Sequence, residues 1–161
     1  MKIKCTLFFS IILLSNLIFS VAQEPVIKDL KNFNSLYVNG NIKVEIYPSD
    51  SPGIGLVVKN TSPDNIVYEI KDFTLNLRLK TNTPKDADVI IKVYYKILNE
   101  IFVTSGAFVI SDIPIKGKAI TFTARMGGKI DLQINMSSLE ASVSLGSVVT
   151  VSGNVQKQIV N

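Results

Sequence analysis

Apolar and polar residues alternate along much of the chain, and this period of two predicts β-strands. The alternation is clearest in residues 36–38, 42–47, 74–80 and 89–94. Because side chains two positions apart in a strand share a face, each segment is expected to bury one face and leave the other in water. Residues 25–97 show no apolar period of three to four, which an amphipathic helix requires. The pattern therefore predicts an all-β fold.

Turn residues separate these predicted strands. The Asn39-Gly40-Asn41 segment offers residues that tolerate positive φ, and it predicts a tight hairpin. Residues 48–53 and 81–84 are rich in proline and small polar residues, and they predict looser loops. Short strands joined by such turns predict an N-terminal antiparallel β portion.

A quasi-repeat begins near residue 98, and glycines mark it. Gly106, Gly127 and Gly146 follow one another at sequence intervals of 21 and 19. Positions at fixed distances after each glycine share their chemistry, as a structural repeat requires. Residues at equal positions of successive repeats form a column, and two columns are expected to face inward. The first, at the third position after each glycine, contains Val109, Ile130 and Val149, and the second, at the fifth position, contains Ser111, Leu132 and Val151.

A second strand recurs in the same repeat. Its apolar positions are Ile120, Phe122 and Ala124, which recur at an interval of 19 as Leu139, Ala141 and Val143. A period near 20 with short strands and glycine corners predicts a right-handed β-helix or β-solenoid-like stack, in which coils pair in register. The spacing leaves one alternative open, an ordinary antiparallel sandwich.

The end of the chain fits this repeat poorly. The apolar alternation of the preceding coil, which starts at Leu139, recurs from Val155 through Lys157 to Ile159, at an interval of only 16. The chain stops at Asn161, where another corner is due, and an open coil end presents unpaired backbone groups that need a cap. We therefore expect a C-terminally shortened domain whose residues 145–161 associate with a second copy or with a partner.

The N-terminal segment, residues 1–22, has the composition of a signal peptide. Lys2 and Lys4 form a basic start, an apolar run follows, and Ser20-Val21-Ala22 places small residues where a signal peptidase cleaves. The run is too short to span a bilayer comfortably, which disfavours the alternative of an uncleaved anchor. We expect cleavage after Ala22, a single mature domain of residues 23–161, and export to the periplasm, the outer cell surface or the medium.

The composition excludes several kinds of catalytic and metal-binding site from this domain. The chain has no histidine, and its one cysteine, Cys5, lies in the predicted signal peptide. Catalytic triads with histidine, cysteine nucleophiles and histidine-based zinc sites are therefore excluded from the mature domain. Removing Lys2 and Lys4 from the 17 Lys and Arg leaves 15 against 13 Asp and Glu, a net charge of +2. A net charge this small gives no electrostatic reason to expect nucleic acid binding.

Two constellations resemble ligand sites. Asp86 and Asp88, with Lys85 nearby, form a carboxylate pair, but no third ligand follows at useful spacing and a solvated loop is the favoured interpretation. Residues 127–131 are similar to the glycine and aspartate repeat that binds calcium in β-rolls, but Ile130 replaces the required glycine and the unit does not recur. We predict no catalytic, cofactor-binding or metal-binding residues.

Adjacent aromatics offer a binding hypothesis. Tyr94 and Tyr95 lie on opposite faces of one predicted strand, so one is expected in the core and the other at the surface beside Phe102 or Phe108. An exposed aromatic on a flat sheet suits sugar stacking or a protein partner.

Several stretches resemble one known family. Residues 33–46, 67–77 and 98–107, together with the glycine repeats, are similar to the bacterial putative auto-transporter adhesin, head GIN domain family, which consists of exported proteins largely of Bacteroidetes. The resemblance implies a β-helix-like stack and an exported location, carries no catalytic signature, and implies relatives that extend further at the C-terminus.

The sequence therefore predicts an exported, non-enzymatic binding module of the cell envelope or the medium. It would act as an adhesin or scaffold through an extended β surface, without a cofactor, on a protein or glycan partner at the cell surface. The alternative is a carbohydrate-active enzyme that uses surface carboxylates on a β-solenoid. An enzyme needs a groove lined by converging charged residues, whereas the predicted outward columns carry mostly Ser, Thr and single charges.

Overall fold

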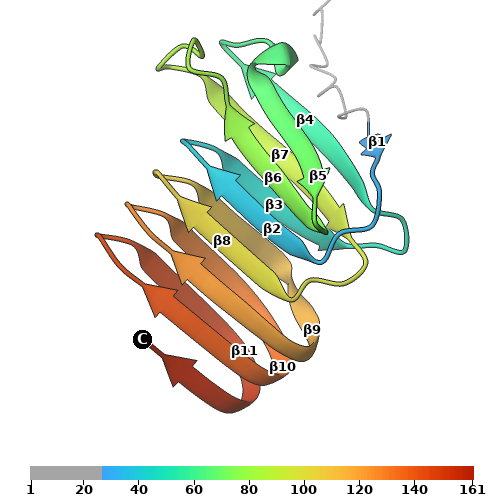
Figure 1. Cartoon of the computed structure of the whole chain (residues 1–161), viewed down its shortest axis with the longest axis vertical. Coiled ribbons are helices and arrows are strands. Elements are labelled where there is room, and N and C mark those ends of the chain that lie inside the picture. The colour runs from blue at the N-terminus through green and yellow to red at the C-terminus, as the bar shows by residue number, and fades with distance from the viewer. Residues whose placement is uncertain (1–26) are drawn as a thin grey trace, which may run out of the picture.

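A computed structural model describes residues 27–161, which are β-strands joined by turns and one short 3₁₀ segment (Figure 1). The predicted signal peptide and its cleavage site lie outside these residues and stay predictions. Within the described part of the chain, no helix is long and apolar enough to cross a membrane. The elements are β1 (Ile27–Asp29), β2 (Ser35–Asn39), β3 (Lys43–Pro48), β4 (Gly53–Lys59), η1 (Pro63–Asn65), β5 (Ile66–Lys71), β6 (Thr74–Leu79), β7 (Asp88–Tyr95), β8 (Glu100–Thr104), β9 (Phe108–Ala124), β10 (Lys129–Val143) and β11 (Val148–Val160).

All eleven strands belong to one sheet that curls on itself into two facing layers (Figure 1). One layer contains β6, β2, β8 and the C-terminal halves of β9, β10 and β11. The other contains β4, β7, β3 and the N-terminal halves of those three long strands. The long strands bend from one layer into the other, so the all-β prediction is confirmed and the apolar faces of both layers meet inside.

The predicted repeat sets the pairing of the long strands. β10 pairs in parallel with β11 at a sequence interval of 19, as in Ile130 opposite Val149. It pairs in parallel with β9 at an interval of 21 up to Leu132 and of 19 from Ile134 onward. Both sets of predicted columns are therefore confirmed, because residues at equal repeat positions are neighbours across the ladders.

The inward columns form a continuous apolar core. Val44, Val109 and Ile130 are each at most 1% exposed, and they lie in register on β3, β9 and β10. Fully burying an aliphatic side chain of this size contributes roughly 1.5–3 kcal/mol, so each added coil contributes its own share of core. Ser111 is the polar exception in these columns, at 8% exposure.

Left-handed turns form the corners at the predicted glycines. Gly106, Gly127 and Gly146 have φ between +73° and +82°, and the residue before each is also left-handed. The backbone N–H of Gly127 donates to the carbonyl of Leu145 at 3.1 Å, so successive corners are hydrogen-bonded to each other. At Gly128 a Cβ would lie 2.8 Å from the carbonyl oxygen of Val103, which leaves no room for a side chain.

The predicted hairpin at Asn39-Gly40-Asn41 is wrong. These residues connect β2 to β3, which do not pair with each other: β2 pairs with β6 and β8, and β3 pairs with β7 and β9. Gly40 does adopt positive φ, at +101°, but a left-handed turn serves a corner between layers as well as a hairpin. The N-terminal portion is accordingly mixed, with antiparallel pairs β1–β4, β4–β7 and β5–β6 beside the parallel ones.

The last strand, β11, pairs with β10 at a constant interval, which the sequence pattern did not reveal. Gln158 lies opposite Leu139 and Val160 opposite Ala141, so the interval of 19 is kept and the shorter predicted one is wrong. Two residues separate the buried Met136 from the buried Leu139, so side-chain alternation changes phase at that bend. The prediction failed because it continued a strict period of two through the bend.

A charge in an inward column is expected to destabilise the fold far more than a charge on the outer face. Ile130→Asp places a carboxylate between Val109 and Val149, where burial without a partner costs about 3 kcal/mol or more. Asn135→Asp, on the same strand but exposed beside Lys116, should change stability by less than about 0.5 kcal/mol. Urea unfolding measures both, and equal midpoints would contradict the assigned columns.

Candidate functional site

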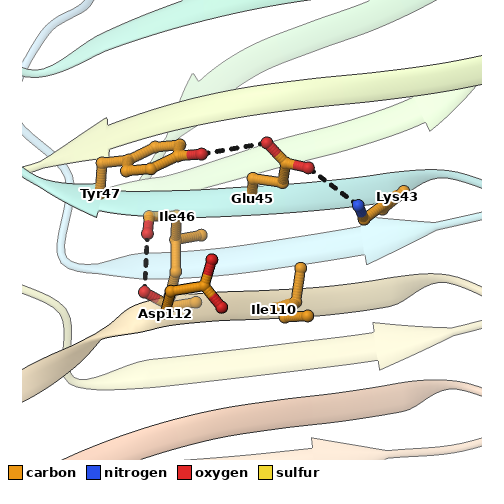
Figure 2. A pocket seen from close by; sticks show the side chains of 7 residues that line it. Lys43, Glu45, Ile46, Tyr47, Ile110 and Asp112 are labelled. Atoms are coloured by element: carbon orange, nitrogen blue, oxygen red, sulfur yellow. Dashed lines mark hydrogen bonds and ion pairs between the residues drawn. The ribbon is translucent and has the colours of Figure 1, made fainter.

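A shallow groove of about 100 Å³ opens on the outer surface where β3 and β9 separate (Figure 2). The two strands pair only from Lys43 opposite Phe108 to Glu45 opposite Ile110. Beyond that point β9 contains the two additional residues that change its sequence interval to β10. The groove is lined by Lys43, Glu45, Ile46, Tyr47, Ile110, Ser111 and Asp112.

Ser111 closes the floor of this groove. Its hydroxyl donates to the carbonyl oxygen of Ile46 at 2.9 Å and accepts a hydrogen bond from the backbone N–H of Ile113 at 3.1 Å. The hydroxyl thereby provides one hydrogen bond to β3 at the point where β9 departs and the ladder between them ends. This explains why a polar residue occupies an inward column at this one position.

A carboxylate network covers the side of the groove formed by β3. Lys43 Nζ lies 2.8 Å from one carboxylate oxygen of Glu45, and the Tyr47 hydroxyl donates to the other at 3.0 Å (Figure 2). The hydrogen bond from Lys43 holds the pKa of Glu45 below its usual value, aided by Tyr47 and opposed by burial. Burial, and then the bond to Glu45, raise the pKa of Tyr47. Glu45 is therefore ionised at neutral pH, with both oxygens engaged.

Two stacked aromatic pairs lie on the outer surface, one on each layer. Tyr47 on β3 stacks on Tyr94 on β7, with ring centroids 5.5 Å apart. On the other layer Tyr37 stacks on Phe102 at 5.1 Å, and the Arg125 guanidinium lies 5.6 Å from the centre of the Phe102 ring. Because β8 lies between β2 and β9, Phe102 has Tyr37 on one side and Arg125 on the other.

The prediction for the adjacent tyrosines is correct in part. Tyr95 is 4% exposed and points into the core, where burial raises its pKa to about 12. Tyr94 lies on the outer surface, but its neighbour is Tyr47 and not Phe102 or Phe108. The predicted neighbour was wrong for Phe102 because β7 and β8 belong to different layers.

The other predicted constellations do not converge. Asp86 is in an exposed loop, where its carbonyl accepts a hydrogen bond from Asn60, and Asp88 begins β7 opposite Lys59. Among residues 27–161, no group of three or more carboxylate, histidine or cysteine side chains is placed to hold a metal ion. In the glycine and aspartate segment, Ile130 is buried while Lys129 and Asp131 face solvent. The prediction that the chain has no catalytic, cofactor-binding or metal-binding residue stays a prediction.

Sequence reasoning missed the groove, although the sequence contained two signals. Alternation places Lys43, Glu45 and Tyr47 on one outward face, where neighbours two positions apart can form hydrogen bonds. The unequal intervals between the corner glycines marked an insertion of two residues. Neither signal identifies Asp112 or Ser111 as the partners across the groove.

The ion pair predicts a pH dependence of stability. Because the folded-state pKa of Glu45 lies below its ordinary value of 4.5, its contribution is present above that pH and is lost as pH falls through the folded pKa. Since solvent screens the pair, Glu45→Gln should lower stability at pH 7 by less than about 1 kcal/mol and should match the parent protein near pH 2. Urea midpoints from pH 7 to 2 measure this. Glu69→Gln, exposed and outside any ion pair in residues 27–161, is the control, and an identical profile for both variants would contradict the assignment.

Comparison with solved structures finds relatives of the same fold. A crystal structure of a putative adhesin from Parabacteroides merdae is 21% identical, with a TM-score of 0.75 over 83% of this chain and 57% of that one. A putative adhesin from Bacteroides fragilis is 17% identical, with a TM-score of 0.70 over 85% and 66%. A putative lipid binding protein from Parabacteroides distasonis is 18% identical, with a TM-score of 0.61 over 87% and 60%. The chain thus spans less than two thirds of the length of these proteins.

Comparison of sequences identifies the family. No curated protein matches the chain. The family model described as "Putative auto-transporter adhesin, head GIN domain" matches residues 32–161, which include nearly all of the described structure. The resemblance seen in the sequence is therefore confirmed, and the chain belongs to the putative auto-transporter adhesin, head GIN domain family.

Proposed function

We propose that this protein is an exported adhesive or scaffolding module that binds through the extended outer surface of its stacked strands. The observation that carries the proposal is the surface itself. Both layers present long outward columns, which alternate with buried residues along β9 and β10. Membership of an adhesin family, and similarity to adhesins in fold, support a binding role.

The architecture we propose is a β-solenoid-like stack in a single domain. Parallel pairing at the two repeat intervals, left-handed glycine corners and corner-to-corner hydrogen bonds support it. In such a stack each coil adds a row of outward side chains to a flat face. A surface of this kind suits polymeric or surface-bound partners better than small metabolites.

The chemistry around Glu45 does not suit the acid of a glycosidase. A glycosidase acid needs a raised pKa so that it is protonated near neutral pH. Glu45 has a lowered pKa and is already engaged by Lys43 and Tyr47. Nothing in residues 27–161 supports the alternative of a carbohydrate-active enzyme, and we propose a location in the cell envelope or the medium on the basis of the predicted signal peptide and the family.

The proposal predicts saturable binding without turnover. Purified protein, expressed from the full chain, should bind at least one class of probe among immobilised glycans and extracellular matrix proteins. Incubation with the same glycans should release no product detectable by mass spectrometry. Absence of binding to every probe, or release of cleaved glycan, would contradict the proposal.

We further propose that two copies pair along the edge of β11. Within residues 27–161, β11 pairs only with β10, and Val149, Val151 and Val155 pack against the core from one side. The other strands at the edges of the described sheet carry charges: β1 is three residues long with Lys28 and Asp29, and β5 carries Glu69 and Lys71. β11 has Lys157 as its single charge over 13 residues. An apolar edge with so little charge recruits another strand.

A second copy fits this edge without charge conflict. In an antiparallel pair of β11 strands centred on Asn154, Lys157 of each copy would face Val151 of the other and not the second Lys157. The pairing would satisfy the open backbone groups of both strands at once. A two-fold arrangement of this kind closes the assembly at a dimer.

Asn154→Lys is expected to convert the dimer into a folded monomer, because Asn154 is exposed on the outer face and two lysines would oppose each other at the centre of the shared edge. Size-exclusion chromatography with light scattering at tens of micromolar measures the change. Ser137→Lys, on the exposed face of β10, is the matched control and should leave the dimer intact. A parent protein that is strictly monomeric, with rapid amide exchange after Gly146, would show that β11 frays instead.

A further inference from the structure

A second recess, separate from the β3–β9 groove, lies where β2, β6 and β8 begin. These strands are parallel neighbours, so the loops that precede them meet at one end of the layer. The recess has a volume of about 360 Å³, within the range of roughly 300–1,000 Å³ that small-ligand sites occupy. We call it the Phe73 recess, and its lining residues are Asn32, Phe33, Asn34, Phe73, Lys96, Ile97 and Asn99.

Phe73 differs from every other aromatic side chain in the described residues. It is 66% exposed, whereas the remaining Phe and Tyr side chains of residues 27–161 are buried or half-buried. Four of those at the surface also stack in pairs, Tyr37 on Phe102 and Tyr47 on Tyr94. Phe73 is therefore the aromatic ring that offers the most surface to a ligand.

The backbone at Phe73 carries a conformational cost that its own packing does not offset. Asp72 and Phe73 form the turn between β5 and β6 with φ of +50° and +59°. Two-residue turns of this type favour asparagine and glycine, and a bulky residue in the left-handed region is rare. Because the ring is largely exposed, its burial contributes little stability against this strain. Strain of this kind concentrates at functional sites.

Backbone hydrogen bonds tie together the loops that form the recess around Phe73. The carbonyl of Phe73 accepts hydrogen bonds from the backbone N–H of Asn34 at 2.9 Å and of Ser35 at 3.2 Å. The backbone N–H of Asn99 donates to the carbonyl of Asn34 at 2.8 Å, and Phe33 beneath is 3% exposed. The backbone of these loops is therefore ordered before a ligand binds, which lowers the entropy cost of forming the site.

The polar groups of the recess suit hydroxyl groups. Asn32 and Asn99 are exposed, and within residues 27–161 their side-chain amides form no hydrogen bond to the protein. Each amide offers a donor and an acceptor, and Lys96 offers further donors. Amides and an ammonium beside an exposed ring match the two surfaces of a sugar, its hydroxyl edge and its apolar C–H face.

We propose that the Phe73 recess binds one pyranose ring of a surface glycan, with Phe73 against the apolar face of the sugar and Asn32, Asn99 and Lys96 on its hydroxyl or carboxylate groups. This inference rests on the proposed adhesive function and names its ligand class and its site. A peptide that adds a strand to the sheet needs a free strand edge, and β2, β6 and β8 are each paired on both sides.

Phe73→Gly tests the site with a variant that should fold at least as well as the parent protein. Glycine relieves the left-handed strain while it removes the ring. The full chain is expressed, and the purified protein is applied to an array of immobilised neutral and uronic acid glycans, with saturation-transfer NMR on the matching methyl pyranosides. Binding should fall about tenfold or more, while the urea midpoint stays equal or rises. Asn99→Ala should also weaken binding.

Met126→Gly is the matched control. Met126 is likewise exposed, at 54%, and left-handed, with φ of +48°, but it lies at a corner outside the recess. Its replacement should leave glycan binding unchanged. Glycan binding that Phe73→Gly does not weaken, or binding to matrix proteins without any glycan binding, would overturn the Phe73 site and leave the adhesive function standing. Binding to no probe of either class would overturn both.

Discussion

Parallel stacking of equal repeat positions is the constraint on which the rest of this structure depends. Inward residues pack against the inward residues of neighbouring strands, and a slip of one residue would expose the whole inward face of a strand to water. Val109, Ile130 and Val149 satisfy this requirement across β9, β10 and β11. Because the inward positions are fixed, the outward positions are fixed as well, and the arrangement of side chains on the outer surface follows from the packing of the core.

The groove shows what happens when one coil is longer than the next. β9 contains two more residues than β10 between matched positions, and the core columns are in register on both sides of this insertion. The additional length is therefore accommodated at the surface, where β9 leaves β3 and Ser111 takes over the hydrogen bonding to Ile46. A polar side chain in an apolar column thus marks the place where the ladder is interrupted.

The sequence predicted the parts of the fold that repeat and missed those that depend on distant partners. Columns such as Ile120 with Leu139 were predictable because equal residue types recur at equal spacing. The turn at Gly40 was misassigned because a left-handed glycine is compatible with a hairpin and with a corner, and only the parallel partners of β2 and β3 distinguish them. The groove could not be predicted from the sequence, because Ser111 and Ile46 are far apart in the chain and meet only in the folded protein.

Left-handed turns account for three of the exposed apolar side chains. Phe73, Met126 and Leu145 have positive φ and are all more than half exposed. Inside the stack, by contrast, backbone groups are used by neighbouring strands and inward side chains are locked in register. The side chains that are free to vary are therefore those of the outward columns and of the turns. These positions can change their chemistry without disturbing the register, which makes the scaffold suited to binding different surfaces.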